Sequence, residues 1–253
     1  MDIYTVFILL VLFSFAPPIV YMIWLRNSER YSKEPMSQVF KVFVWGAIFG
    51  VIIAALLSLA IMNIIDSFID RPYLFGWESE FFIGLLLVIV IAPFVEELAK
   101  GVGVFTAHDE ITEAEDGLVY GASAGLGFAA TENLLYGLLA YGLSGLEVSL
   151  FLIALRSISS AFLHASASSV MGYGIARSIV SSGVHGAFPF YLLAVIMHAT
   201  FNFIASVQDL FEGEILGVSF AMIALFIAIA FAVAAITIVR LKIMKIDREP
   251  RPY

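Results

Sequence analysis

The sequence predicts an all-α membrane protein, a polytopic bundle of about seven transmembrane helices. Of its 253 residues, 61% are apolar and only 13% carry charge, and the mean hydropathy is +0.99. Soluble globular domains are about half apolar and roughly a quarter charged, so this composition is typical of membrane proteins. The apolar residues gather into runs long enough to cross about 30 Å of hydrocarbon. Helices are expected in these runs because an open sheet in lipid would leave backbone groups without partners.

Seven such runs follow one another along the chain. The first has no basic residues before it and is too long for the apolar core of a signal peptide, so we expect a retained helix. The third and fifth runs are long enough to be tilted or bent. No stretch is left for a separate soluble domain, so residues 1–253 are expected to form a single membrane-embedded domain. The runs cover about residues 3–24, 39–62, 80–106, 117–141, 148–177, 187–208 and 215–240.

The basic residues predict the orientation, because loops on the cytoplasmic side are enriched in Lys and Arg. An outside N-terminus and a cytoplasmic C-terminus place ten basic residues in the cytoplasm and leave only Arg71 outside. We therefore expect a multi-pass protein of the cell membrane with this orientation. The ten are Arg26, Arg30, Lys33, Lys41, Arg177, Arg240, Lys242, Lys245, Arg248 and Arg251.

Small residues indicate where helices pack closely. Gly117, Gly121 and Gly125 recur every four residues in the fourth run, a spacing that lets helix backbones approach each other in lipid. Packing alone explains such glycines. The fifth run has a similar stripe with a histidine in it, formed by Ser160, His164, Ser168, Gly172 and Ala176.

The chain has no cysteine, which excludes disulfides, thiolate metal sites and a cysteine nucleophile. Its net charge is −8, and nothing in it resembles a nucleic-acid-binding surface. Any chemistry must come from Glu, His, Asp, Asn, Ser and Lys side chains.

Four consecutive runs carry polar groups that are costly inside a membrane. Each ionised group at the bilayer centre costs about 2.5–3.5 kcal/mol on insertion scales. Such groups are best compensated in one shared polar cavity, where they pair with one another and with water. They are Glu96, Glu97 and Lys100 in the third run, Glu132 and Asn133 in the fourth, Arg156 and His164 in the fifth, and His198 and Asn202 in the sixth.

Their spacing supports convergence on such a cavity. Glu96 and Lys100 are four residues apart, so they share a helix face and can form an ion pair. Glu97 lies about 100° further round and can face a different neighbour. His198 and Asn202 are also four apart and can both point into the cavity.

Pro93 stands three residues before Glu96. A proline inside a helix removes one backbone hydrogen bond and favours a bend. We therefore expect the third helix to bend there and to free a carbonyl group near the carboxylates.

This set of side chains contains the parts needed for hydrolysis. Two adjacent carboxylates in a low-dielectric pocket cannot both be ionised cheaply, and one of them is suited to act as a general base toward water. A histidine opposite could stabilise a developing oxyanion or could bind a metal. The candidate metal ligands are Glu97, His164 and His198, and zinc is the candidate ion. The chain has no His-Glu-x-x-His motif, which leaves open the choice between a glutamate and a metal mechanism.

Each feature alone also has an ordinary explanation. A Glu-Glu pair can be a solvated helix end, His164 can be a packing residue, and Arg156 can extend to the membrane interface. His108 and His185 fall in predicted loops and are assigned no role. A proton- or ion-coupled transporter is an alternative, as is a catalytically silent membrane scaffold. The transporter is disfavoured because no inverted repeat is visible and the polar groups lie on consecutive runs.

The motifs resemble those of the PrsW family of intramembrane proteases, distant relatives of the type II CAAX prenyl proteases. The resemblance begins at S-E-R-Y-S-K-E-P (residues 28–35), and E-E-L-A-K (96–100) is similar to the family's E-E-x-x-K. The most specific match is D-G-L-V-Y-G-A-S-A-G-L-G-F-A-A-T-E-N-L-L-Y (116–136). It continues from Arg156 through H-A-S-A-S-S-V-M-G-Y-G (164–174) to H-A-T-F-N (198–202).

This resemblance implies an intramembrane endopeptidase. It implies that Glu96 and Glu97 form a catalytic carboxylate pair, completed by His164 and by His198 with Asn202. Glu132 ends an F-x-x-x-E motif, where the prenyl proteases carry a histidine. Lys100, Asn133 and Arg156 would support the carboxylates. The implied substrate is a membrane-anchored protein in the lipid bilayer, for example an anti-sigma factor.

Overall fold

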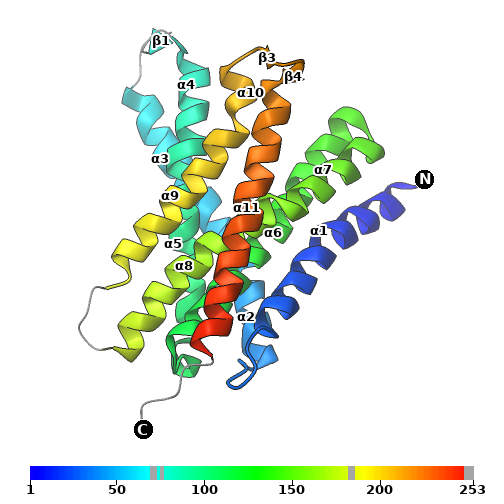
Figure 1. The fold of residues 1–253 in the computed structure, drawn as a ribbon. Coiled ribbons are helices and arrows are strands. Elements are labelled where there is room, and N and C mark those ends of the chain that lie inside the picture. Colours follow the sequence, from blue (N-terminus) through cyan, green and yellow to red (C-terminus); the bar gives the residue numbers. More distant parts are fainter. Residues whose placement is uncertain (69–72, 75–76, 182–185, 248–253) are drawn as a thin grey trace.

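The protein is a bundle of long helices that run roughly along one direction (Figure 1). The computed structural model describes residues 1–68, 73–74, 77–181 and 186–247. Two short hairpins, β1–β2 and β3–β4, lie at one end of the bundle. The elements are α1 (Ile3–Arg26), α2 (Met36–Trp45), η1 (Gly46–Gly50), α3 (Val51–Phe68), β1 (Tyr73–Leu74), β2 (Trp77–Glu78), α4 (Ser79–Leu86), η2 (Leu87–Ile91), α5 (Ala92–Phe105), η3 (His108–Glu110), α6 (Ala114–Ser144), α7 (Leu146–Ile158), α8 (Ser160–Val180), α9 (Phe188–Ala205), α10 (Val207–Leu210), β3 (Glu214–Ile215), β4 (Val218–Ser219) and α11 (Phe220–Ile246).

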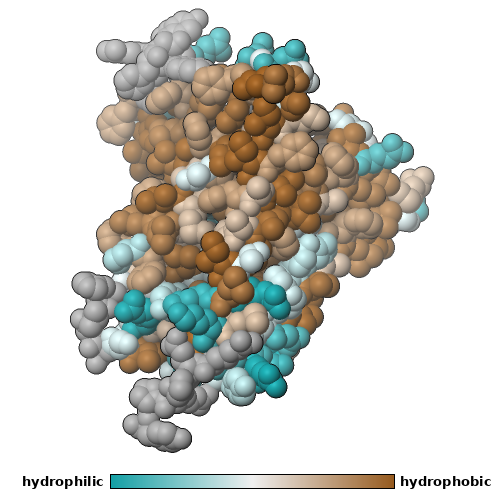
Figure 2. Space-filling view, viewed as in Figure 1, coloured by the Kyte–Doolittle hydropathy of each residue, from teal (hydrophilic) through white to brown (hydrophobic). Residues whose placement is uncertain are grey.

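The prediction of an all-α, multi-pass membrane bundle is confirmed. Six helical segments of the described residues are long and apolar enough to cross a membrane. Figure 2 shows a broad hydrophobic band around the middle of the molecule and hydrophilic residues gathered toward the end near the C-terminus. The six segments are Ile3–Arg26, Met36–Phe68, Glu80–Phe105, Leu146–Val180, Phe188–Ala205 and Phe220–Ile246.

Helix α6, the predicted fourth span, is outside this set and has a different role. Every residue from Glu115 to Ala130 is buried, and α6 packs against α1, α2, α5, α7 and α8. It is therefore the central helix. Its small residues face other helices, whereas the outer helices present large apolar residues to lipid. A Cβ atom on Gly121 would clash with the carbonyl oxygen of Ser168, and one on Gly125 with that of His164. This contact confirms that the small residues of the fourth run pack closely against another helix, which is α8.

The third and fifth runs are interrupted, as their lengths suggested. The third run contains the π-helical turn η2 immediately before α5, and Pro93 stands in the first turn of α5. The fifth run consists of two helices, α7 and α8, which meet at Ser159. A further π-helical turn, η1, interrupts the second run.

Candidate active site

Helices α5, α6, α7, α8 and α9 bring the predicted polar residues together inside the bundle. A cavity of about 670 Å³ opens among helices α5 to α11. Its wall is mostly apolar, with side chains such as Leu152, Phe201 and Leu225. The predicted site residues that line it are Glu96, Glu132, Arg156, His164 and Asn202.

The two adjacent glutamates have different environments. The Glu97 side chain is completely buried. It accepts hydrogen bonds from Lys100 Nζ at 2.8 Å, His198 Nδ1 at 2.9 Å and Ser168 Oγ at 2.8 Å. The Glu96 side chain is 12% exposed and lines the cavity. Because a helix turns about 100° per residue, Glu97 is an internal anchor and Glu96 is the carboxylate that a molecule in the cavity can reach.

Lys100 is a buried cation that joins both glutamates to His164. Its Nζ lies 3.4 Å from Glu96 Oε2, which confirms the expected ion pair, and 2.8 Å from His164 Nδ1. It also lies 4.2 Å from the centre of the Phe128 ring. An ammonium group can only donate, so His164 accepts at Nδ1 and carries its proton on Nε2.

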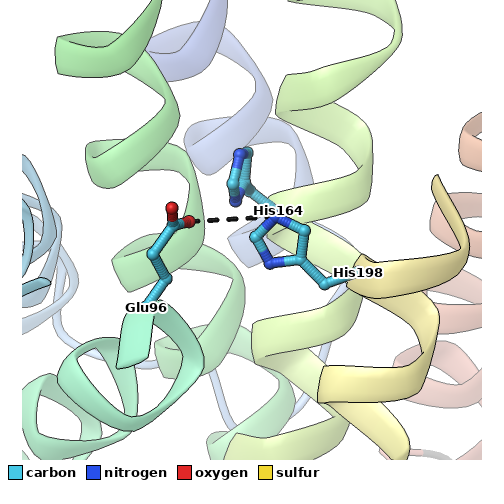
Figure 3. Close-up of side chains that lie close together, drawn as sticks. All are labelled: Glu96, His164 and His198. Atoms are coloured by element: carbon cyan, nitrogen blue, oxygen red, sulfur yellow. Dashed lines mark ion pairs between the residues drawn. The ribbon is translucent and has the colours of Figure 1, made fainter. Parts of the chain in front are cut away.

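The hydrogen-bond partners also determine the tautomer of the neutral His198 ring. A carboxylate only accepts, so His198 donates its Nδ1 proton to Glu97. In the neutral ring the Nε2 atom, 3.8 Å from Glu96 Oε2, presents a lone pair. Figure 3 shows the Glu96 carboxylate directed toward the imidazoles of His164 and His198. The two rings lie nearly perpendicular, with centres 4.7 Å apart.

Glu132 is held by two donors at the wall of the cavity. Arg156 donates to Glu132 at 2.6 Å, and His164 Nε2 lies 2.9 Å from the same Glu132 oxygen. Arg156 also donates to Asn133 Oδ1 at 2.9 Å and to Ser160 Oγ at 3.1 Å. Arg156 therefore lies inside the site and donates hydrogen bonds to three of its side chains.

Pro93 and Asn202 are linked through one carbonyl group. Ala92 donates its backbone N–H to Leu87 in the π-helical pattern, so the next donor in that pattern would be residue 93. Proline has no N–H, and the carbonyl of Val88 accepts a hydrogen bond from Asn202 Nδ2 at 2.8 Å instead. The Val88 carbonyl group is therefore freed at Pro93, and Val88 lines the same cavity as Glu96.

The position of Asn202 corrects one expectation from the sequence. Asn202 was expected to complete the site together with His198. The structure instead shows its amide bonded to the carbonyl of Val88 in η2, while Glu97 orients His198. Asn202 still lines the cavity. The helix break frees the Val88 carbonyl, which the Asn202 amide then contacts. The spacing of side chains on α9 alone does not reveal this partner.

The donor groups that could hold a metal differ by one residue from the predicted set. Glu96, His164 and His198 each offer a donor atom, and the three atoms lie within 4.8 Å of one another. One carboxylate and two imidazoles are ligands that zinc accepts. Glu97 then has the position of an outer partner that holds His198, an arrangement common around metal-bound histidines. The residues fit a metal, and Glu96 rather than Glu97 is the carboxylate positioned as a ligand.

Some side chains around the site were not singled out by the sequence analysis as site residues. Ser168 binds Glu97, and Phe128 lies beside Lys100. Ser168 lies one helical turn beyond His164 in the polar stripe, and that spacing was the available signal. His108 is exposed in η3, and His185 lies outside the described residues.

Comparison with known proteins places the chain in a family. The family model described as "PrsW family intramembrane metalloprotease" matches residues 34–235. The chain is 27% identical to Protease PrsW of Clostridioides difficile (strain 630), over 79% of this chain and 80% of the relative. It is 28% identical to Protease PrsW of Geobacillus kaustophilus over 77% of this chain and 78% of the relative. For Protease PrsW of Bacillus subtilis (strain 168) the identity is 28%, over 71% of this chain and 81% of the relative. No solved structure matches the chain. The chain belongs to the PrsW family of intramembrane proteases.

Proposed function

We propose that this intramembrane protease is an endopeptidase for membrane-anchored proteins and that Glu96 activates the attacking water. The supporting observation is the pair formed by Glu96 Oε2 and His198 Nε2, 3.8 Å apart at the cavity. Both atoms accept hydrogen bonds, so a water molecule that donates to both would complement them. Such a water would be oriented and next to a general base.

In the first step Glu96 takes a proton from this water. The resulting hydroxide adds to the carbonyl carbon of the scissile peptide, and the carbonyl oxygen becomes an oxyanion. Lys100, with its Nζ 3.4 Å from Glu96 and 2.8 Å from Glu97, offsets the charge of the two carboxylates. The buried pair Glu97–Lys100 thus allows Glu96 to work in a low-dielectric interior.

The oxyanion needs a hydrogen-bond donor on the cavity wall. His164 lines the cavity and carries its Nε2 proton toward Glu132. A small shift of this donor from Glu132 to the oxyanion would stabilise the tetrahedral intermediate, while Arg156 keeps Glu132 paired. The carbon–nitrogen bond then breaks, and the leaving amine takes the proton from Glu96. The products are a carboxylic acid and an amine, which exchange a proton to give a carboxylate and an ammonium group, and the site returns to its starting state.

A metal-assisted version is the second candidate, favoured by the donor set of Glu96, His164 and His198. A bound zinc ion would lower the pKa of its water and polarise the substrate carbonyl. His164 already contacts Lys100 and Glu132, so it would exchange one of these contacts to become a ligand. Glu97 would keep His198 in place through Nδ1.

The substrate class follows from the location of the site. The apolar wall of the cavity, within helices that cross the membrane, suits a membrane-spanning segment better than a soluble peptide. An anti-sigma factor with a single membrane anchor is one such substrate. Its transmembrane segment would unwind locally at the site, because a helical peptide bond is already hydrogen-bonded and shielded.

The experiment is cleavage of candidate single-pass membrane proteins by purified protein in liposomes. We would compare the parent protein with Glu96→Gln and Glu97→Gln, each with and without a zinc chelator. We expect cleavage by the parent and a loss in Glu96→Gln without unfolding. Equal cleavage by all three proteins would contradict the proposed site. Loss of cleavage with the chelator and recovery with zinc would select the metal-assisted version, and insensitivity would select the glutamate version.

A further inference from the structure

A second group of carboxylates lies away from the active site, where the loop between α1 and α2 meets the start of α6. It consists of Glu29, Glu34 and Asp116, which are 0%, 5% and 0% exposed. Each offers one oxygen atom, and the three atoms lie within 4.8 Å of one another. Asp116 precedes Glu132 by sixteen residues on the same helix, which corresponds to about 24 Å along its axis.

Each of the three carboxylates is held in place through one oxygen. Glu29 Oε2 accepts from the backbone N–H of Glu34 at 3.1 Å. Asp116 Oδ2 accepts from the backbone N–H groups of Thr112 at 2.7 Å and Glu113 at 2.8 Å. Glu34 Oε2 accepts from the hydroxyl group of Tyr120. The backbone of the loop and of the start of α6 therefore orients the group.

The other oxygens of Glu29 and Asp116 have no partner. Glu29 Oε1 and Asp116 Oδ1 are buried, and neither forms a hydrogen bond in the structure. Leaving a buried polar atom without a partner costs about 1–3 kcal/mol, and more for a charged group. These two oxygens therefore lack a hydrogen-bond partner among the described residues.

Among the described residues, no Lys or Arg forms an ion pair with any of the three carboxylates. Arg26 donates to the backbone carbonyl of Glu34, and Arg240 donates to the hydroxyl of Ser28. Three acidic side chains are therefore buried together here without a described cationic side chain paired to them.

We propose that Glu29, Glu34 and Asp116 bind a hard divalent cation such as Mg²⁺ or Ca²⁺. All three donors are carboxylate oxygens, which these ions prefer, and no imidazole is present to favour zinc. The unpartnered oxygens of Glu29 and Asp116 would become ligands. The ion would tie the α1–α2 loop to the first turn of α6, the helix that carries Glu132 into the active site.

Binding can be measured on the full-length protein in detergent after divalent ions have been removed. Tb³⁺ is a suitable probe, since it binds oxygen ligands and can be excited through Tyr120 beside the site. The measurement is made in the Glu96→Gln background, which removes one donor of the candidate metal set in the active site. We expect saturable Tb³⁺ luminescence that Ca²⁺ or Mg²⁺ displaces.

The variants decide whether these carboxylates are the ligands. Glu29→Gln and Asp116→Asn should each weaken Tb³⁺ binding by at least about tenfold, since ligand charge controls affinity in such sites. Glu110→Gln is the matched control, because Glu110 is an exposed acid in the adjoining η3 turn, and it should leave the affinity unchanged. Absence of binding, or equal weakening by all three variants, would overturn the proposal.

Thermal unfolding provides a second test, because divalent ions should change the melting temperatures of the parent and of Glu29→Gln differently. Without divalent ions, Glu29→Gln should be at least as stable as the parent, because it replaces a buried acid with a neutral amide. With Ca²⁺ or Mg²⁺, the parent should gain melting temperature and Glu29→Gln should not. A parent that gains nothing, or a variant that is less stable even without divalent ions, would mean that the carboxyl groups share protons and bind no ion.

Discussion

His198 presents its Nε2 atom to Glu96 Oε2 across 3.8 Å. This relationship distinguishes the two neighbouring glutamates, because the other ring nitrogen of the histidine is bonded to Glu97 at 2.9 Å. One carboxylate orients the imidazole, and the other shares with it a space for water or a metal. The first two predictions follow from this division of roles.

Replacing the two glutamates should have different consequences. Glu96→Gln should lower cleavage by about a hundredfold or more, the scale of general-base catalysis, while the protein stays folded. Glu97→Gln should lower cleavage and, in addition, the free energy of unfolding by about 3–5 kcal/mol, because it breaks a buried ion pair. Cleavage in liposomes and thermal unfolding in detergent measure the two effects.

The matched control for these variants is Glu80→Gln, since Glu80 is an exposed acid on the same helical segment. It should change neither quantity. If Glu96→Gln were as destabilised as Glu97→Gln, both carboxylates would be structural.

His198→Asn should separate the two nitrogens of the histidine. The asparagine amide places an N–H group near the position of Nδ1 and nothing at Nε2. The bond to Glu97 is then retained, so most of the stability should remain, while cleavage should fall by about a hundredfold. The same cleavage and unfolding assays apply. His108→Asn, at an exposed histidine, is the control, and undiminished cleavage by His198→Asn would exclude a role for Nε2.

Pro93 and Asn202 should be coupled through the Val88 carbonyl. Asn202→Leu should cost about 1–3 kcal/mol, because it leaves that carbonyl without its donor. In a Pro93→Ala background the alanine supplies a backbone N–H, so Asn202→Leu should cost less. A double-mutant cycle on the unfolding free energy measures this coupling, for which about 0.5–3 kcal/mol is typical of contacting residues. Strict additivity would show that the amide and the proline act independently.

The contact between α6 and α8 should tolerate no side chain at Gly121. Gly121→Ala should destabilise the protein, because the new Cβ atom would overlap the carbonyl oxygen of Ser168. Gly142→Ala is the control on the same helix, since a Cβ there meets nothing within 4 Å. It should be neutral or stabilising by about 1 kcal/mol through helix propensity. Thermal unfolding of both variants tests this, and equal stability would contradict the close packing.

The absence of cysteine makes the orientation easy to test. With an outside N-terminus and a cytoplasmic C-terminus, Glu110→Cys should be protected from a membrane-impermeant maleimide in intact cells. Glu214→Cys, in the β3–β4 hairpin, should be labelled. Both positions are exposed, so they differ only in the side of the membrane. The reverse labelling pattern would invert the predicted orientation.

Much of the fold could be predicted from the sequence because the membrane imposes a simple rule on it. Long apolar runs must be helical and must span, so helices such as α1 and α11 follow from hydropathy alone. Pro93 predicted the break in the third run, because proline has no backbone N–H group. The division of the fifth run at Ser159 and the π-helical turn η1 depend on neighbouring helices, and no local signal placed them.

The candidate site was predictable as a set of residues but not as an arrangement. Buried charge is so costly in lipid that Glu96, Lys100, Glu132 and His164 had to converge. Adjacent residues such as Glu96 and Glu97 are equivalent in a sequence. The three-dimensional packing distinguished them by placing Ser168 and His198 against one glutamate and the cavity against the other.

The sequence by itself therefore determined the class of protein, its strongly apolar spans and the side chains that carry its chemistry. These properties follow from hydropathy and from the spacing of residues along single helices. Only the tertiary structure decided which glutamate faces the cavity, what orients His198, and that Glu29, Glu34 and Asp116 meet. The physical reason is that each of these depends on contacts between helices and loops that are distant in the chain.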